Sequence, residues 1–154
     1  MMSKAVSARV NYVRFLWKEG IETTEYIFRY DEDNHPRLCD MSSRDAEEPP
    51  CVKVKDSFVR ELEQLLEQGN VLSYAAFYEP EEALCGGYVW ELSVKMDDGQ
   101  SVYSSGHSVQ PENSIIPGLG LMMRSYLAKH ISNKQTIQIK QIVGEQLLQN
   151  IPSH

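Results

Sequence analysis

The residues best suited to chemistry lie on one short segment in the second half of the chain. Tyr103, Ser105 and His107 alternate along an expected strand, and Glu91 lies on the strand expected to precede it. Serine catalysis needs a base within about 2.6–3.2 Å of the hydroxyl. Residues two apart on one strand are roughly 6–7 Å apart at the backbone, and no G-x-S-x-G elbow is present. The pattern favours the polar, outward side of a strand, and a small hydrolase or ligand-binding enzyme using these four residues is the alternative.

A second candidate is the run of Asp31, Asp33 and His35, whose spacing resembles that of metal ligands. As a calcium loop the run fails, because Pro36 stands where the sharp-turning glycine belongs and Ser42 replaces the bidentate glutamate. Aspartate and asparagine are also the residues that build turns. We therefore predict a turn here, with no metal and no other cofactor.

Two acidic segments are candidate contact sites for a basic protein partner, in which charged residues at the rim would speed association. The net charge of −7 and the scattered positions of the 15 lysines and arginines argue against nucleic acid as a partner. A solvated surface explains the same composition. The candidate residues are Glu47 and Glu48 in one segment and Glu79, Glu81 and Glu82 in the other.

Cysteine usage and the absence of long apolar runs bear on the compartment. Cys39, Cys51 and Cys85 are an odd number with no C-x-x-C pair, which favours free thiols in a reducing compartment. No run approaches the roughly 18–20 apolar residues of a membrane span, and polar residues interrupt the N-terminal segment where a secretory signal would be apolar. We expect a cytoplasmic protein without membrane contact.

The elements that must position these residues are mostly strands. Alternating β-branched and aromatic residues predict strands over 8–18, 22–30, 37–42 and 71–78, with a short one over 51–54. Residues 1–8 are expected to be disordered.

Helices are predicted at two or three places. The clearest covers 56–68, where apolar residues recur at helical spacing and Asp56 or Ser57 can serve as the N-cap. Another follows Pro111, beginning near Asn113 or at Pro117. The tail, 132–154, is expected to form a peripheral helix, although its residues 136–142 also alternate like a strand.

The segment 87–107 predicts a hairpin, because Asp98-Gly99 is a strong turn signal between alternating arms. A two-residue loop would place Trp90 opposite His107, whereas a three-residue loop would place it opposite Gly106. The second register lets the large ring lie across a bare glycine. We favour it, and it turns Tyr103, Ser105 and His107 away from the core.

Together these elements predict a single domain, 1–154, of the α+β class. The expected architecture is an antiparallel sheet of five to seven strands with two or three helices packed on one face. The first hairpin carries large residues on both sides, so its exposed face is expected to be rich in aromatics and to be covered by the C-terminal segment, a second copy or a partner.

The order of these elements resembles a known pattern. An amphipathic helix is followed by a strand containing W-E-L-S-V, a D-D-G turn, a strand ending in Gly106, then Pro111 and a Leu/Met-rich helix. This is similar to small uncharacterised bacterial proteins, many of them from Firmicutes, over roughly residues 52–130. The resemblance implies an α+β fold and a bacterial origin, and it implies no activity, because none is assigned to that group.

The functional expectation is a non-enzymatic binding or protein-interaction module. It would associate with itself as a homodimer or, in an immunity-like or inhibitor-like variant, block a basic protein through the acidic loops. The alternative is the enzyme built on the 87–107 hairpin, and the hairpin register discriminates between the two.

Overall fold

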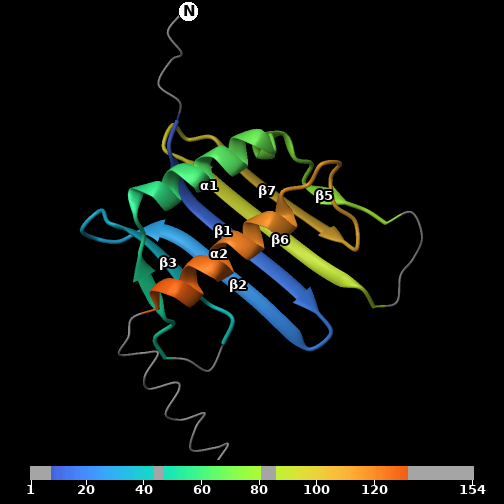
Figure 1. Cartoon of the computed structure of the whole chain (residues 1–154). Helices are drawn as coiled ribbons and strands as arrows, with labels where there is room; N and C mark the ends of the chain where they lie inside the picture. The colour runs from blue at the N-terminus through green and yellow to red at the C-terminus, as the bar shows by residue number, and fades with distance from the viewer. Residues whose placement is uncertain (1–7, 44–46, 81–85, 132–154) are drawn as a thin grey trace, which may run out of the picture.

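The computed structural model describes residues 8–43, 47–80 and 86–131. Within these ranges, seven strands form one sheet and two α-helices cover one of its faces (Figure 1), which confirms the predicted α+β architecture. The expectations for 1–7 and 132–154 lie outside the described residues. The elements are β1 (Val10–Glu19), β2 (Glu22–Tyr30), β3 (Pro36–Asp40), β4 (Cys51–Lys53), α1 (Asp56–Gln68), the 3-10 helix η1 (Val71–Ser73), β5 (Phe77–Tyr78), β6 (Tyr88–Met96), β7 (Ser101–His107) and α2 (Ile116–His130).

The sheet has the strand order β4-β3-β2-β1-β6-β7-β5. Every neighbouring pair is antiparallel except β5 and β7, which run parallel. The long central strands β1 and β6 bury alternate side chains under the helices, as a half-buried sheet requires. Examples are Val13 and Phe15 on β1 and Trp90, Leu92 and Val94 on β6, all at most 3% exposed.

The β6–β7 hairpin adopts the predicted three-residue register. Trp90 lies opposite Gly106 and Val94 lies opposite Val102. The indole ring is fully buried, and its Nε1 donates a hydrogen bond of 2.6 Å to the carbonyl oxygen of Val109. Gly99 has a φ of +92°, which is the left-handed conformation that closes such a loop. This register turns Tyr103, Ser105 and His107 to the face without helices.

Helix α1 occupies the predicted range and buries Phe58, Val59, Leu62 and Leu66. Its start differs from the expectation, because neither Asp56 nor Ser57 is the N-cap. Lys55 occupies that position without a side-chain cap. Its N–H instead donates to the hydroxyl of Tyr126 on α2, at 2.9 Å. A contact between the two helices therefore satisfies the backbone N–H of the N-cap residue, one of the N–H groups that lack a partner within the helix.

The predicted strand over 71–78 is wrong for most of its length. Asn70 adopts a left-handed conformation, with φ of +49°, and ends α1. The chain then forms η1 and reaches the sheet only at the two residues of β5. The hydroxyl of Ser73 donates to the carbonyl oxygen of Asn70, which holds this turn closed at 2.7 Å.

The prediction of free thiols is wrong for two of the three cysteines. Cys39 and Cys51 lie directly opposite each other on β3 and β4 and form a disulfide. Directly opposed residues of an antiparallel pair place their side chains on the same face at short range. Sequence spacing alone did not reveal this pairing, because it depends on the register of β3 with β4. Cys85 lies outside the described residues.

Candidate binding groove

The polar residues singled out from the sequence lie on the helix-free face of the sheet. Ser105 is directly opposite Glu91 in the β6–β7 ladder. Its hydroxyl reaches the carbonyl oxygen of Ala76 at 3.4 Å, while His107 Nε2 lies 2.8 Å from the carbonyl oxygen of Gly86. Serine and histidine therefore each bond to a different backbone carbonyl and not to each other, so the geometry shows no serine–histidine pair.

Glu91 is also committed elsewhere. Arg14 on β1 donates to Glu91 at 3.0 Å and to Glu25 on β2 at 2.7 Å, so one guanidinium links three neighbouring strands. Burial raises the pKa of the Tyr103 hydroxyl, and the negative charge of Glu91 raises it further. A phenol with a raised pKa stays protonated near neutral pH and is a poor base. Tyr103 is also 51% exposed.

The Asp31 segment forms the predicted turn. The Asp31 carboxylate accepts hydrogen bonds from the backbone N–H groups of Asp33 and His35, each at 2.9 Å, and from Arg37 Nε at 2.8 Å. The bonds from His35 and Arg37 lower the pKa of Asp31 to about 2. Carboxylate and imidazole atoms of the three candidate ligands lie within 4.8 Å of one another. Because the Asp31 oxygens already hold the turn, the arrangement is explained without a metal.

The acidic segments do not form one patch. Glu47 and Glu48 are exposed beside β4, whereas Glu79 is exposed beside β5. These strands are the two opposite edges of the sheet. Glu81 and Glu82 lie outside the described residues. A single compact contact with a basic partner would therefore involve only one of the two acidic segments.

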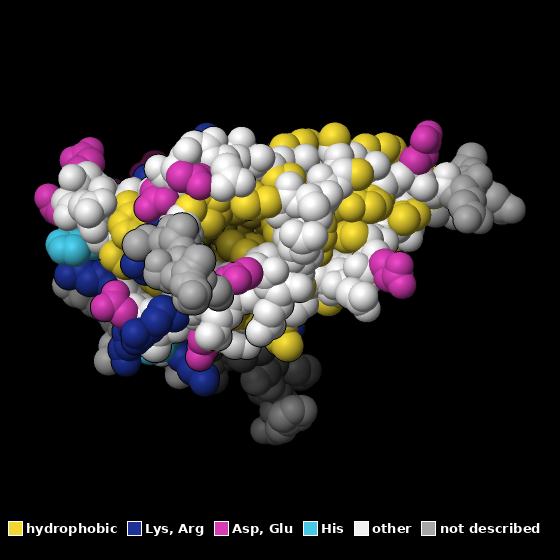
Figure 2. Space-filling view, turned by 90° about the horizontal axis from the view of Figure 1, so that it is seen from above, with side chains coloured by type: hydrophobic (Ala, Val, Ile, Leu, Met, Phe, Trp, Pro, Cys, Tyr) yellow, Lys and Arg dark blue, Asp and Glu magenta, His cyan; other side chains and the backbone are white. Residues whose placement is uncertain are grey.

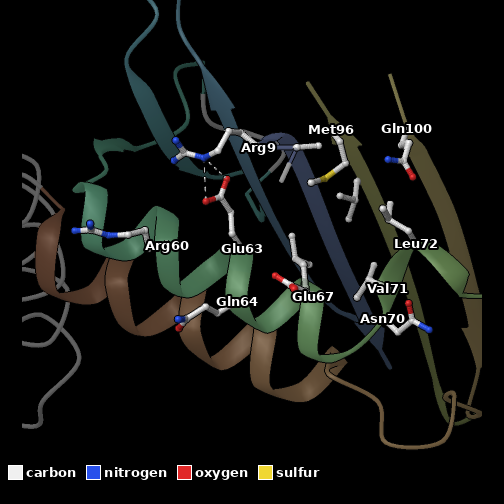
Figure 3. A pocket seen from close by; sticks show the side chains of 13 residues that line it. Arg9, Arg60, Glu63, Gln64, Glu67, Asn70, Val71, Leu72, Met96 and Gln100 are labelled. Carbon is white, nitrogen blue, oxygen red and sulfur yellow. Dashed lines mark hydrogen bonds and ion pairs between the residues drawn. The ribbon is translucent and has the colours of Figure 1, made fainter. Parts of the chain in front are cut away.

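A groove on the helix-covered side was not predicted. It lies between α1 from Arg60 onward, η1 and the adjoining ends of β1 and β6, and it encloses about 420 Å³ (Figure 3). Seen from above, the molecule has a hollow with hydrophobic side chains on its floor (Figure 2). We call this feature the α1 groove; its lining residues are Ala8, Arg9, Arg60, Glu63, Gln64, Leu66, Glu67, Asn70, Val71, Leu72, Val94, Met96 and Gln100.

The floor of the α1 groove is apolar and well packed. Leu66, Val71 and Val94 are at most 6% exposed and belong to the hydrophobic core. Met96 packs against that core, and Leu72 is 40% exposed at the end of the groove. An apolar floor with polar groups above it is the usual composition of a ligand pocket, and the volume lies within the range of about 300–1,000 Å³ that such pockets have.

One side of the rim is fixed by Glu63. Its two oxygens share one bifurcated hydrogen bond from Arg9 Nε, at 2.8 and 3.1 Å, and the carboxylate accepts another from the backbone N–H of Val10 at 2.9 Å. The backbone N–H of Arg9 donates to Asp97 at 2.9 Å. These bonds hold the start of β1 against α1 and against the β6–β7 turn. These hydrogen bonds therefore fix the position of Glu63 and Arg9 on the rim.

Four other residues on the rim have side chains without a hydrogen-bonding or ionic partner among the described residues. Arg60, Gln64 and Glu67 project from α1, and Asn70 follows it (Figure 3). Among the described residues, the side chains of these four make no hydrogen bond or ion pair. Charged and amide groups beside an apolar floor remain available to a bound molecule.

A second, smaller hollow lies beside α2. It encloses about 210 Å³ and is lined in part by Phe15, Trp17, Tyr26 and Arg124. Gly120 allows α2 to approach closely, because a Cβ there would lie 2.6 Å from the Phe15 ring. This hollow offers fewer charged groups than the α1 groove, because Arg124 is the only charged residue among the described residues that line it.

The sequence did not predict the α1 groove, because Arg60, Glu63 and Glu67 lie outside the apolar stripe of α1, where helical periodicity predicts only contact with solvent. The periodicity of α1 correctly separates its buried and outward faces. It does not show that the outward face borders a hollow, because that depends on where η1 and β1 lie.

No protein-family model matches the sequence, and no curated protein matches it either. The resemblance to small bacterial proteins therefore stays a prediction. Among the described residues, no α-helix is long and apolar enough to cross a membrane.

Proposed function

We propose that the protein is a non-enzymatic binding protein and that the α1 groove is its binding site. The observation that carries this proposal is the combination of a buried apolar floor with uncommitted polar side chains on the rim. A largely pre-formed concave site of this kind binds without a large ordering cost.

The chemistry of the lining supports binding over catalysis. The described residues that line the groove include no serine, threonine, cysteine, tyrosine or histidine, so this part of the lining offers no hydroxyl, thiol or imidazole. Of its two carboxylates, Glu63 is held by Arg9 and Val10. The hydrolase alternative rests on the helix-free face, where Ser105 and His107 bond to separate backbone carbonyls.

A dye that combines an apolar ring system with one charge tests the proposal. We expect 8-anilinonaphthalene-1-sulfonate to bind the folded protein with increased fluorescence. Leu72→Glu, which places a charge at the end of the groove on a residue already 40% exposed, should reduce this binding several-fold. Ile21→Glu introduces the same charge at a fully exposed turn far from the groove and serves as the control.

The proposal fails if Leu72→Glu binds the dye as the wild type does. It also fails if backbone amide shifts on dye titration cluster on the helix-free face around Glu91 and not around Val71 and Leu72. Circular dichroism of each variant verifies that the fold is retained.

The proposal extends to the protein's partner and its cellular compartment. Native mass spectrometry of the protein from its own cells tests two expectations, self-association and an immunity-like block of a basic protein. A cytoplasmic location is a separate expectation. The Cys39–Cys51 disulfide bears against the location, because cytosolic thiols are normally kept reduced.

A further inference from the structure

We propose that the α1 groove binds a short, extended, apolar peptide with free termini, its carboxylate at Arg60 and its ammonium at Glu67. This inference rests on the proposed function and specifies the ligand class. Three independent features of the groove support it: the charges on the rim, the carboxamides along it and the apolar floor.

The two free charges on the rim have opposite sign and a defined separation. Arg60 and Glu67 are seven residues apart on α1, so they lie on the same side of the helix and about 10.5 Å apart along its axis. An extended peptide advances about 3.3 Å per residue. The ammonium and carboxylate of a peptide of about three residues therefore match the spacing of the two side chains.

The direction of α1 favours the same orientation. Its C-terminal end, near Glu67, carries partial negative charge, and its N-terminal end carries partial positive charge. A ligand ammonium is thus favoured at the Glu67 end and a carboxylate at the Arg60 end. Glu63, which lies between them, is neutralised by its bond to Arg9 and does not compete for the ammonium.

Carboxamides line the groove between and beyond these charges. Gln64 and Asn70 make no side-chain hydrogen bond among the described residues. The Gln100 amide nitrogen bonds to Asp98, which leaves its carbonyl oxygen to accept a bond. A carboxamide offers both donors and an acceptor, which are the complements of peptide C=O and N–H groups. A fatty acid or a hydrocarbon would leave these groups without partners.

The floor selects for apolar side chains. Leu66, Val71 and Val94 present only hydrocarbon to the groove. A polar side chain placed against them would lose its hydrogen bonds to water without replacement. The ligand expected from all three features is a peptide such as Leu-Val-Leu.

Isothermal titration calorimetry with Leu-Val-Leu tests the inference through a set of matched pairs. The peptide is used with free termini, with an acetylated N-terminus and with an amidated C-terminus. Each is titrated into the wild type, Arg60→Gln and Glu67→Gln. The controls are Arg29→Gln and Glu61→Gln, which remove the same charges at exposed positions that do not line the groove.

The expected result is selective loss. Glu67→Gln should weaken binding of the free and the amidated peptide about 1.5- to 5-fold, as for an exposed ion pair, and should leave the acetylated peptide unaffected. Arg60→Gln should weaken the free and the acetylated peptide by a similar factor and leave the amidated peptide unaffected. The control variants should bind all three peptides as the wild type does.

Three outcomes would overturn the inference. Equal losses with all three peptides would show that the termini do not meet these side chains. Binding of the dye without binding of any peptide would remove the peptide ligand and leave the proposed function standing. Binding of neither would remove both.

Discussion

Replacing Gly106 with alanine tests the register on which the placement of the polar cluster depends. An alanine Cβ at this position would lie 2.3 Å from the carbonyl oxygen of Val109 and 2.4 Å from Trp90 Nε1. Real Cβ atoms do not approach other atoms so closely, so either the backbone or the indole must move. Trp90 is fully buried, and the strand continues on both sides of Gly106, so neither movement is easy.

The expected cost follows from two terms. Overpacking a tight core site costs about 1–3 kcal/mol, and the rigid neighbours here place Gly106→Ala near the upper end of that range. Displacing the indole also weakens its 2.6 Å hydrogen bond to Val109, and a typical bond of this kind contributes about 1 kcal/mol. We therefore expect a loss of about 3–4 kcal/mol in the free energy of unfolding. For a domain of this size the melting temperature should fall by about 10 °C.

The assay is urea unfolding followed by tryptophan fluorescence, with Gly118→Ala as the matched control. A Cβ at Gly118 on α2 would meet no atom within 4 Å. The same chemical change should there stabilise the helix by up to about 1 kcal/mol. If Gly106→Ala unfolds within about 0.5 kcal/mol of the wild type, the register is wrong. Trp90 would then face His107, and the assignment of the polar cluster to the helix-free face would have to be withdrawn.

Three further predictions concern the other features of the fold. Reduction, or Cys51→Ser, should lower the free energy of unfolding by about 2–3 kcal/mol, because the Cys39–Cys51 bond closes a loop of 12 residues; alkylation after reduction should label two more cysteines than before it. NMR titration should give Asp31 a pKa of about 2. Because this folded pKa is depressed, its stabilisation is fully present above about pH 4 and is lost as the pH falls through about 2, and Arg37→Gln should raise the value. His107→Ala should change stability by less than about 1 kcal/mol, since the half-buried ring makes one hydrogen bond within the described part of the chain, to a loop carbonyl; a loss of several kcal/mol would show that the residue is misplaced.

The sequence predicted those parts of the fold that depend on local chemistry. The Asp98-Gly99 turn together with the Trp90–Gly106 pair determined the hairpin register, because only one loop length gives the ring a glycine to lie across. The periodicity of Phe58 and Leu62 likewise predicted α1 within its observed bounds. In both cases the residues that determine the structure are neighbours in the element that they form.

The missed features depend on residues distant in sequence. The Cys39–Cys51 bond requires the register of β3 with β4, and the N–H of the α1 N-cap residue, Lys55, donates to a hydroxyl from Tyr126 on α2. The α1 groove depends on how α1 ends. A Cβ at Gly69, directly after α1, would lie 2.5 Å from the side chain of Ile115, directly before α2, so this close approach needs a glycine. No local sequence pattern predicts a contact between residues so far apart in the chain.

Helix α1 thus carries two separate sets of side chains, and this separation determines how the proposed binding site can be tested. Leu62 and Leu66 hold α1 on the sheet, whereas Arg60 and Glu67 lie on its exposed side without partners among the described residues. Changes at exposed, unpaired positions typically alter stability by less than about 0.5 kcal/mol. The charges on the rim can thus be exchanged without loss of fold, so a change in binding at Arg60 or Glu67 reports on the ligand and not on the scaffold. At Leu66 the two effects cannot be separated, because the side chain belongs both to the groove floor and to the core.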